Sequence, residues 1–141
     1  MKKTYLLSAM IVLSAIVSLN AMEASRPAVW KKLDKAVEIA EDHGDWSGVF
    51  NILTKHGKTG DLVNEYISPD GDLLLMVALN DHDVKAAEIL LRLYNANPNA
   101  LNTAEGNPFL QEARLWKEKD RGNQRMVNLL KRNGATDGFK K

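Results

Sequence analysis

The residues whose types could do chemistry are the histidines and the carboxylates beside them. Imidazole titrates near neutral pH and binds transition metals, whereas aspartate oxygens suit harder cations. The most ligand-like cluster is Asp81, His82 and Asp83, and His43 with Asp45 repeats the pattern more weakly. Neighbouring side chains converge on one ion only if the loop wraps around it, and no fourth ligand follows at a recognised spacing. We therefore expect no metal site and solvated histidines.

Covalent catalysis has few candidate residues in this sequence. The chain has no cysteine, no Gly-x-Ser-x-Gly turn and no His-Glu-x-x-His helix. The adjacent carboxylates Glu41 and Asp42 diverge on a helix surface, so they do not form an acid–base pair. The sequence predicts a protein that is not an enzyme and needs no cofactor. A metal-dependent or accessory envelope enzyme that uses Asp81 and His82 stays as the alternative.

The N-terminal residues have the layout of a secretory signal peptide. Lys2 and Lys3 precede an uncharged stretch at 5–19, and a small residue, Ala21, suits the cleavage position. A membrane span needs about 20 apolar residues, and this stretch is shorter and interrupted by serines. We expect residues 1–21 to be removed, so the chain meets the membrane only in transit. The Met-Lys-Lys start is typical of bacteria, which predicts a periplasmic or secreted protein.

The length and composition of the chain indicate one domain. Its nearly balanced charge predicts neither an acidic nor a basic partner. The chain has 19 basic and 18 acidic residues, and without cysteine its folding must rest on packing alone. Basic residues are concentrated from Arg114 onward, where the sequence has nine basic and three acidic residues. Nucleic-acid binding is disfavoured because export separates the chain from nucleic acid. We interpret the basic third as the solvated outer face of a terminal unit.

The elements that position these residues are helices that recur in pairs. Apolar residues at three- and four-residue intervals predict a helix over 27–41, with Pro27 in its first turn. Asp45 is placed to cap a second helix that ends at Gly57. After a turn at Asp70-Gly71, the pair returns as helices over 73–79 and 86–94, and Asp83 is placed to cap the latter.

A third pair completes the series. Residues 106–108 open its first helix, which carries Phe109, Leu110, Ala113 and Trp116 as apolar residues. Asn123 is placed to cap the last helix, in which Met126, Val127, Leu129 and Leu130 form the apolar side. Trp30 and Trp46 fall among apolar helical positions, so they are expected in the core or at a cap. Tyr66 and Ile67 either pack under the first connector or face a ligand.

The second helices repeat at a spacing that predicts stacked units. The matching residues Ile52 and Ile89 lie 37 residues apart, and Leu129 follows Ile89 after 40. One helix pair cannot bury its apolar face alone, so successive pairs must share a core. Leu53, Leu90 and Leu130 are predicted at the centre of that core.

The repeated phrases resemble the ankyrin-repeat family, whose unit is about 33 residues with two helices and a hairpin-like turn. Residues 122–135 are similar to its second helix, 95–100 to its Gly-Ala-Asp-Pro-Asn exit, and 106–110 to its Gly-x-Thr-Pro-Leu-His opening. The resemblance implies an all-α helix-turn-helix solenoid of about three repeats within residues 22–138. Residues 27–66 form a degenerate capping repeat, 67–103 and 104–138 form the other two repeats, and 139–141 form a basic tail.

This sequence also departs from the family pattern. The opening histidine is Leu75 in repeat two and Leu110 in repeat three, and the opening proline is Leu73 in repeat two. Residues 115–121 lengthen the third unit, either as a longer first helix with Trp116 packed inward or as a contact loop with Trp116 as anchor. Another α-solenoid, such as a tetratricopeptide array, is the alternative fold.

The resemblance implies a monomeric scaffold that binds an unidentified protein through its turn tips and the exposed side of its first helices. Stacking places equivalent residues of successive repeats in a row, which creates an extended binding surface. A self-associating structural envelope protein is a further alternative. The implied contact residues are Asp70, Asp72, Glu105 and Asn107 at the tips, with Asp81, His82, Trp116, Lys119 and Arg121 near the inter-helix turns.

Overall fold

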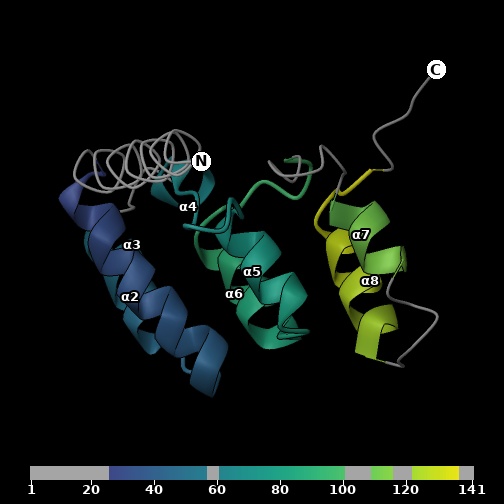
Figure 1. Ribbon diagram of the computed structural model, residues 1–141. Helices are drawn as coiled ribbons and strands as arrows, with labels where there is room; N and C mark the ends of the chain where they lie inside the picture. Colours follow the sequence, from purple (N-terminus) through teal and green to yellow (C-terminus); the bar gives the residue numbers. More distant parts are fainter. Residues whose placement is uncertain (1–25, 57–60, 101–108, 116–121, 137–141) are drawn as a thin grey trace, which may run out of the picture. The chain divides into compact units, whose positions relative to one another are not determined.

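The computed structural model describes residues 26–56, 61–100, 109–115 and 122–136 (Figure 1). Over these ranges the chain forms helices, turns and one isolated antiparallel bridge between Ile67 and Leu73, so the predicted all-α class is confirmed. The helices are α2 (Ala28–His43), α3 (Ser47–His56), α4 (Asp61–Glu65), α5 (Leu74–Asn80), α6 (Val84–Leu93), α7 (Phe109–Leu115) and α8 (Gly122–Arg132).

The chain divides into two compact units, residues 1–31 and 32–141. In the first unit, the carbonyl of Pro27 accepts the amide hydrogens of Trp30 and Lys31, which opens α2 where the sequence predicts. The guanidinium of Arg26 lies 5.1 Å from the centre of the Trp30 ring. The predicted signal peptide, residues 1–21, lies outside the described residues. Among the helices that the structure describes, none has the length and apolarity to cross a membrane.

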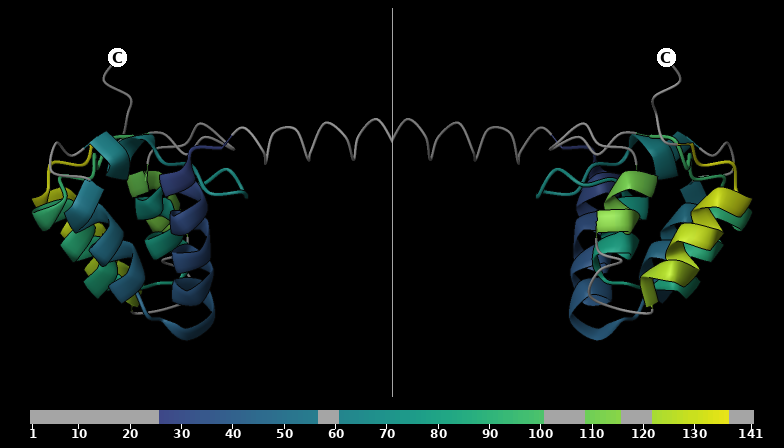
Figure 2. Two further views of the ribbon diagram at one scale, coloured as in Figure 1. Left: turned by 90° about the vertical axis from the view of Figure 1, so that its left-hand side faces the viewer. Right: turned by 90° about the vertical axis from the view of Figure 1, so that its right-hand side faces the viewer.

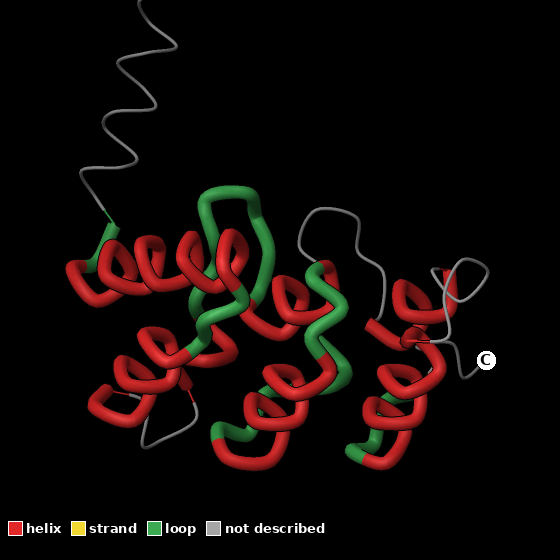
Figure 3. The backbone as a smooth tube through the Cα atoms, turned by 90° about the horizontal axis from the view of Figure 1, so that it is seen from below, coloured by secondary structure: helices red, strands yellow, loops and turns green. Residues whose placement is uncertain are grey.

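Within the second unit the helices pack in pairs. Helix α5 packs on α6, α7 on α8, and α6 on α8, while the short α4 follows and packs on α3. Figure 2 shows α5 and α7 on one side of this unit and α6 and α8 on the other, and Figure 3 shows the same two rows from below. Helices α2 and α3 meet at Gly48, where a Cβ atom would lie 3.3 Å from the Cβ of Ala36. Glycine therefore permits their close approach.

The core consists of the apolar sides predicted from periodicity. Leu53, Leu90 and Leu130, predicted at its centre, are each at most 1% exposed. In α5 every residue from Leu74 to Leu79 is buried, because neighbours cover this helix on all sides. Tyr66 is fully buried under the connector, and its hydroxyl donates to Asp34 Oδ1 at 2.8 Å. The packing alternative for Tyr66 is therefore confirmed.

Local hydrogen bonds confirm two of the three predicted helix caps. Asp45 Oδ1 accepts the amide hydrogen of Ser47 at 2.9 Å, and Asp83 Oδ1 accepts that of Ala86 at 2.9 Å. The prediction for Asn123 is wrong, because α8 already begins at Gly122 and places Asn123 inside its first turn. Gly57 and residues 106–108, predicted to end and open helices, lie outside the described residues.

The predicted turn at Asp70 and Gly71 is also confirmed. Gly71 has a positive φ of 92°, which favours glycine, and its amide donates to the Ser68 carbonyl at 3.0 Å. The Ser68 amide donates to the Asp72 carbonyl at 2.8 Å, and the Asp72 amide donates to Ser68 Oγ at 3.1 Å. These bonds close a tight turn that holds Asp70 and Asp72 at its tip.

The second helices α6 and α8 end in similar ways. Asn95 has a φ of 56° and Gly134 a φ of 89°, so both adopt the left-handed conformation that stops a helix. The amide of the next residue then reaches back into the helix: Ala96 donates to Leu90 and Ala135 to Leu130, both at 3.0 Å. The two endings are therefore similar but not identical, because the bond reaches back six residues in α6 and five in α8.

Asn64, in α4, and Asn99, in the connector after α6, each bond to the segment that follows the next second helix. Asn64 Oδ1 accepts the Asn97 amide hydrogen at 2.7 Å, and Asn64 Nδ2 donates to the Asn95 carbonyl at 3.2 Å. Asn99 makes the same pair of bonds one unit later, to the Thr136 amide at 2.8 Å and the Gly134 carbonyl at 3.0 Å. We call these two residues the asparagine clamps.

Asn99→Ala is expected to lower the free energy of unfolding by about 1 kcal/mol, because the side chain loses its bonds with the Thr136 amide, the Thr136 hydroxyl and the Gly134 carbonyl. Thermal unfolding measures the effect. Asn128→Ala is the control, since it removes only a bond between two exposed side chains within α8, from Gln124 Nε2 at 3.0 Å. Equal midpoints for the two variants would mean that the clamp does not stabilise the fold.

Candidate functional site: an acidic face

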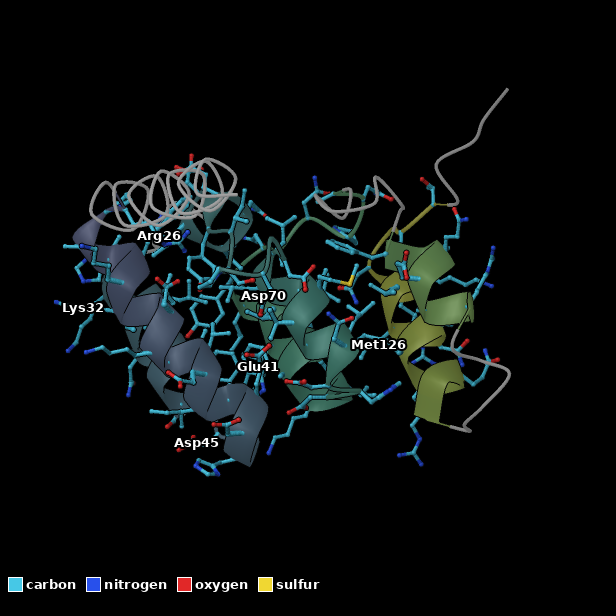
Figure 4. All side chains as sticks on the ribbon, viewed as in Figure 1. Arg26, Lys32, Glu41, Asp45, Asp70 and Met126 are labelled. Carbon is cyan, nitrogen blue, oxygen red and sulfur yellow. The ribbon has the colours of Figure 1, made fainter. Side chains whose placement is uncertain are left out.

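Carboxylates from three separate segments lie near one another in the second unit. Glu41 is near the end of α2, Asp70 and Asp72 are in the turn before α5, and Asp81 follows α5. We call these four residues the acidic face; Figure 4 labels Glu41 and Asp70. Partial burial raises the pKa of Glu41 above its ordinary value of 4.5, and Asp81, Asp70, Asp72 and, more weakly, Asp42 raise it further. The charged groups that act on Glu41 are all acidic.

The α5–α6 turn extends this negative field. Burial raises the pKa of Asp81 above 3.8, followed by the charge of Asp83, while His82 partly opposes them. His82 is exposed and has a φ of 55°, a conformation rare for residues other than glycine. Its amide donates to the Leu79 carbonyl at 2.9 Å, which fixes the turn. The turn therefore holds Asp81 close to the end of α5.

The arrangement suits attraction of a positive charge. Four carboxylates that lie near one another create a negative surface potential, which attracts and orients a basic partner. The three histidines are exposed, as predicted. Over the described ranges, no three His, Asp or Glu residues are arranged to hold a metal ion. Asp83 and Asp45 each already accept a backbone amide hydrogen as helix caps.

The structure brings together three of the predicted contact residues. Asp70, Asp72 and Asp81 belong to the acidic face, and His82 adjoins it. The other predicted contacts, Glu105, Asn107, Trp116, Lys119 and Arg121, lie outside the described residues. So does most of the 115–121 insertion, and its two alternatives stay open.

Sequence reasoning missed Glu41 as a contact residue. In the sequence Glu41 stands beside Asp42, and that neighbour alone predicts no site. The available signal was its place on the exposed side near the end of a first helix, the side on which the resemblance places contacts. Its neighbours in space, Asp70 and Asp81, are about 30 and 40 residues away in sequence.

Glu41→Gln is expected to raise the unfolding midpoint at pH 7. Because the folded pKa of Glu41 is raised, the folded state binds this proton more tightly than the unfolded state, so stability falls as pH rises through 4.5 toward the folded pKa. The penalty is fully present at neutral pH, and it is small because Glu41 is exposed. Melting curves at pH 7 and below pH 4.5 measure it. The gain should shrink in acid; a variant that is less stable at pH 7 would contradict the repulsion.

Comparisons with known proteins add no family to this description. No family model matches the chain, and no match was found among the curated proteins or the solved structures.

Proposed function

We propose that this chain is an exported, non-enzymatic scaffold of the ankyrin type that binds another protein through the acidic face. The observation that carries the proposal is the gathering of Glu41, Asp70, Asp72 and Asp81 from successive helix pairs. Stacking places equivalent turns in a row, and side chains at those turns then form one surface. Such a surface recognises an extended partner without chemistry of its own.

The repeat architecture is supported by contacts that recur one unit apart. The asparagine clamps Asn64 and Asn99 make matching bonds, and the segments Asn95-Ala96 and Gly134-Ala135 end α6 and α8 alike. These segments belong to the phrases that resemble the ankyrin family. Between units, α6 packs on α8, as stacked second helices must.

The partner that fits this face is a protein with a basic segment. Opposite charges raise the association rate and exclude acidic competitors, and salt weakens both effects. We propose that the scaffold is monomeric, so that the face is free for its partner. Sedimentation of the purified chain at several concentrations distinguishes this from the self-associating alternative.

Export determines which partners the scaffold meets. The proposed signal peptide at 1–21 sends the chain to the periplasm or beyond the cell. Fractionation of bacteria that produce the chain with a tag after Lys141 gives its location. A tagged chain that stays in the cytoplasm would contradict export while leaving binding by the acidic face intact.

The experiment that tests the function is capture in the compartment where the chain is found. The tagged full-length chain is cross-linked there, and bound proteins are identified by mass spectrometry. The captured partner is expected to carry a basic segment and to dissociate as salt rises. A partner that has no basic segment and stays bound in salt would contradict recognition by charge.

A further inference from the structure

A pocket of about 270 Å³ lies between α3 and the first turns of α6. Its lining is mainly apolar: two aromatic rings from α3 and its entry turn face two aliphatic side chains of α6. Polar groups are confined to the residues that begin the two helices. The apolar lining is Trp46, Phe50, Ala86 and Ile89, and the remaining lining residues are Gly44, Ser47, Asp83 and Lys85.

The aromatic side of the pocket is held in place by its own contacts. The rings of Trp46 and Phe50 stack with centroids 6.1 Å apart, and Phe50 stacks on Tyr94 at 5.8 Å. The hydroxyl of Tyr94 donates to the Phe50 carbonyl at 3.1 Å and also bonds Thr54 Oγ1 at 2.8 Å. A rigid aromatic surface loses little conformational freedom when a ligand binds.

Trp46 carries a polar group that this packing leaves unsatisfied. The residue is only 5% exposed, and its indole Nε1 is buried without a hydrogen-bond partner in the described part of the chain. A buried indole N–H ordinarily has an acceptor. The nearby carboxylates of Asp45 and Asp83 already accept backbone amides. An acceptor from a bound molecule would complete the hydrogen bonding of Trp46.

The pocket adjoins the acidic face through the α5–α6 turn. Asp83 lines the pocket and is two residues from Asp81 of the acidic face. A molecule that fills the pocket therefore extends toward negative charge. An apolar group alone would leave those carboxylates without a counter-charge, whereas a basic segment with one large apolar side chain complements both surfaces.

We propose that the pocket takes one bulky apolar side chain of the partner's basic segment, whose backbone carbonyl accepts the indole hydrogen of Trp46. Lysine or arginine residues on either side of that side chain contact the acidic face. This inference rests on the proposed function and adds the type of sequence that the scaffold recognises. The pocket provides specificity, and the carboxylates provide long-range attraction.

The first test selects random twelve-residue peptides on phage against the immobilised full-length chain. The wild type is expected to enrich peptides that have one large apolar residue between lysines or arginines. Ile89→Gln, in the pocket, should weaken binding of those peptides at least tenfold, while Asp70→Lys with Asp72→Lys should remove the preference for basic residues. Ile39→Gln is the matched control, because Ile39 is an exposed isoleucine that does not line the pocket.

The second test follows the Trp46 indole directly in a proton–nitrogen correlation spectrum of the full-length chain. Its signal is assigned by its loss in Trp46→Phe. Addition of a selected peptide is expected to shift this signal downfield, as a hydrogen bond forms, and to leave the Trp30 signal unchanged. The titration itself uses the wild-type chain, so only the assignment needs a folded variant, and the conservative Trp46→Phe change keeps an aromatic ring in the pocket.

The outcomes separate the pocket from the acidic face. Peptides selected for basic residues alone, or an indole signal that does not move, would overturn the pocket inference and leave the proposed function standing. Peptides selected for an apolar residue alone, with binding that is insensitive to the Asp70 and Asp72 reversals, would overturn the acidic face and leave the pocket. No enrichment over the random library would overturn both.

Discussion

Leu130→Ala is expected to lower the free energy of unfolding by about 2–5 kcal/mol. Leu130 is fully buried in α8, which packs on both α6 and α7, so truncation leaves a cavity that no single helix can close. Domains of this kind have total stabilities of about 5–15 kcal/mol, so the loss is a large fraction of the whole. Because α6, α7 and α8 pack together in one core, the loss should weaken the whole unit rather than α8 alone.

Thermal and urea unfolding, followed by circular dichroism, measure this effect. Leu93→Ala is the matched control, because Leu93 is the same residue type near the end of α6 but is 71% exposed. Its substitution should change stability by less than about 0.5 kcal/mol. A Leu130→Ala midpoint that equals the control would contradict the shared core.

Asp70→Lys combined with Asp72→Lys is expected to reduce capture of the partner at least tenfold, which corresponds to about 1.4 kcal/mol. Both carboxylates lie at the tip of the turn before α5 and act on Glu41, so their reversal turns the edge of the acidic face positive. The two introduced lysines would then repel a basic segment that the two aspartates attract.

The control for this pair is Glu65→Lys combined with Glu88→Lys. Glu65 is exposed and Glu88 is half-buried. Their substitution changes the net charge by the same amount, and neither residue acts on Glu41. Glu88 pairs with Arg92 at 3.0 Å, an exposed ion pair that contributes little to stability. Capture should survive in the control. In the Asp70→Lys and Asp72→Lys variant, the lost bond from Asn80 Nδ2 to Asp72 Oδ2 at 3.1 Å and the relieved repulsion of Glu41 have opposite effects on stability, so its melt should stay close to wild type. Equal loss of capture in both would mean that overall charge, not the acidic face, attracts the partner.

The helices and their core could be predicted because they follow from local spacing. Three- and four-residue periodicity placed Leu53, Leu90 and Leu130 inside, and short-range chemistry placed Asp45 and Asp83 as caps. Helices α6 and α8 end just before Asn95 and Gly134, which are residue types that tolerate a positive φ. Each of these features depends on residues within one or two turns of one another.

The features that sequence reasoning missed depend on distant residues. Helix α4, Asp61–Glu65, is too short to show a period. The asparagine clamp from Asn64 to Asn97 joins residues about 30 apart, and only the fold brings them together. Glu41 became part of a site because two later segments lie against it, and the unsatisfied nitrogen of Trp46 is a property of packing.

Calorimetric titration of the captured partner into the full-length chain, at increasing salt, tests most directly whether this scaffold recognises its partner by charge. The dissociation constant is expected to rise with salt for the wild type and to be larger, with a weaker salt dependence, for the Asp70→Lys and Asp72→Lys double variant. The same constant and the same salt dependence for both chains would contradict the acidic face as the binding surface.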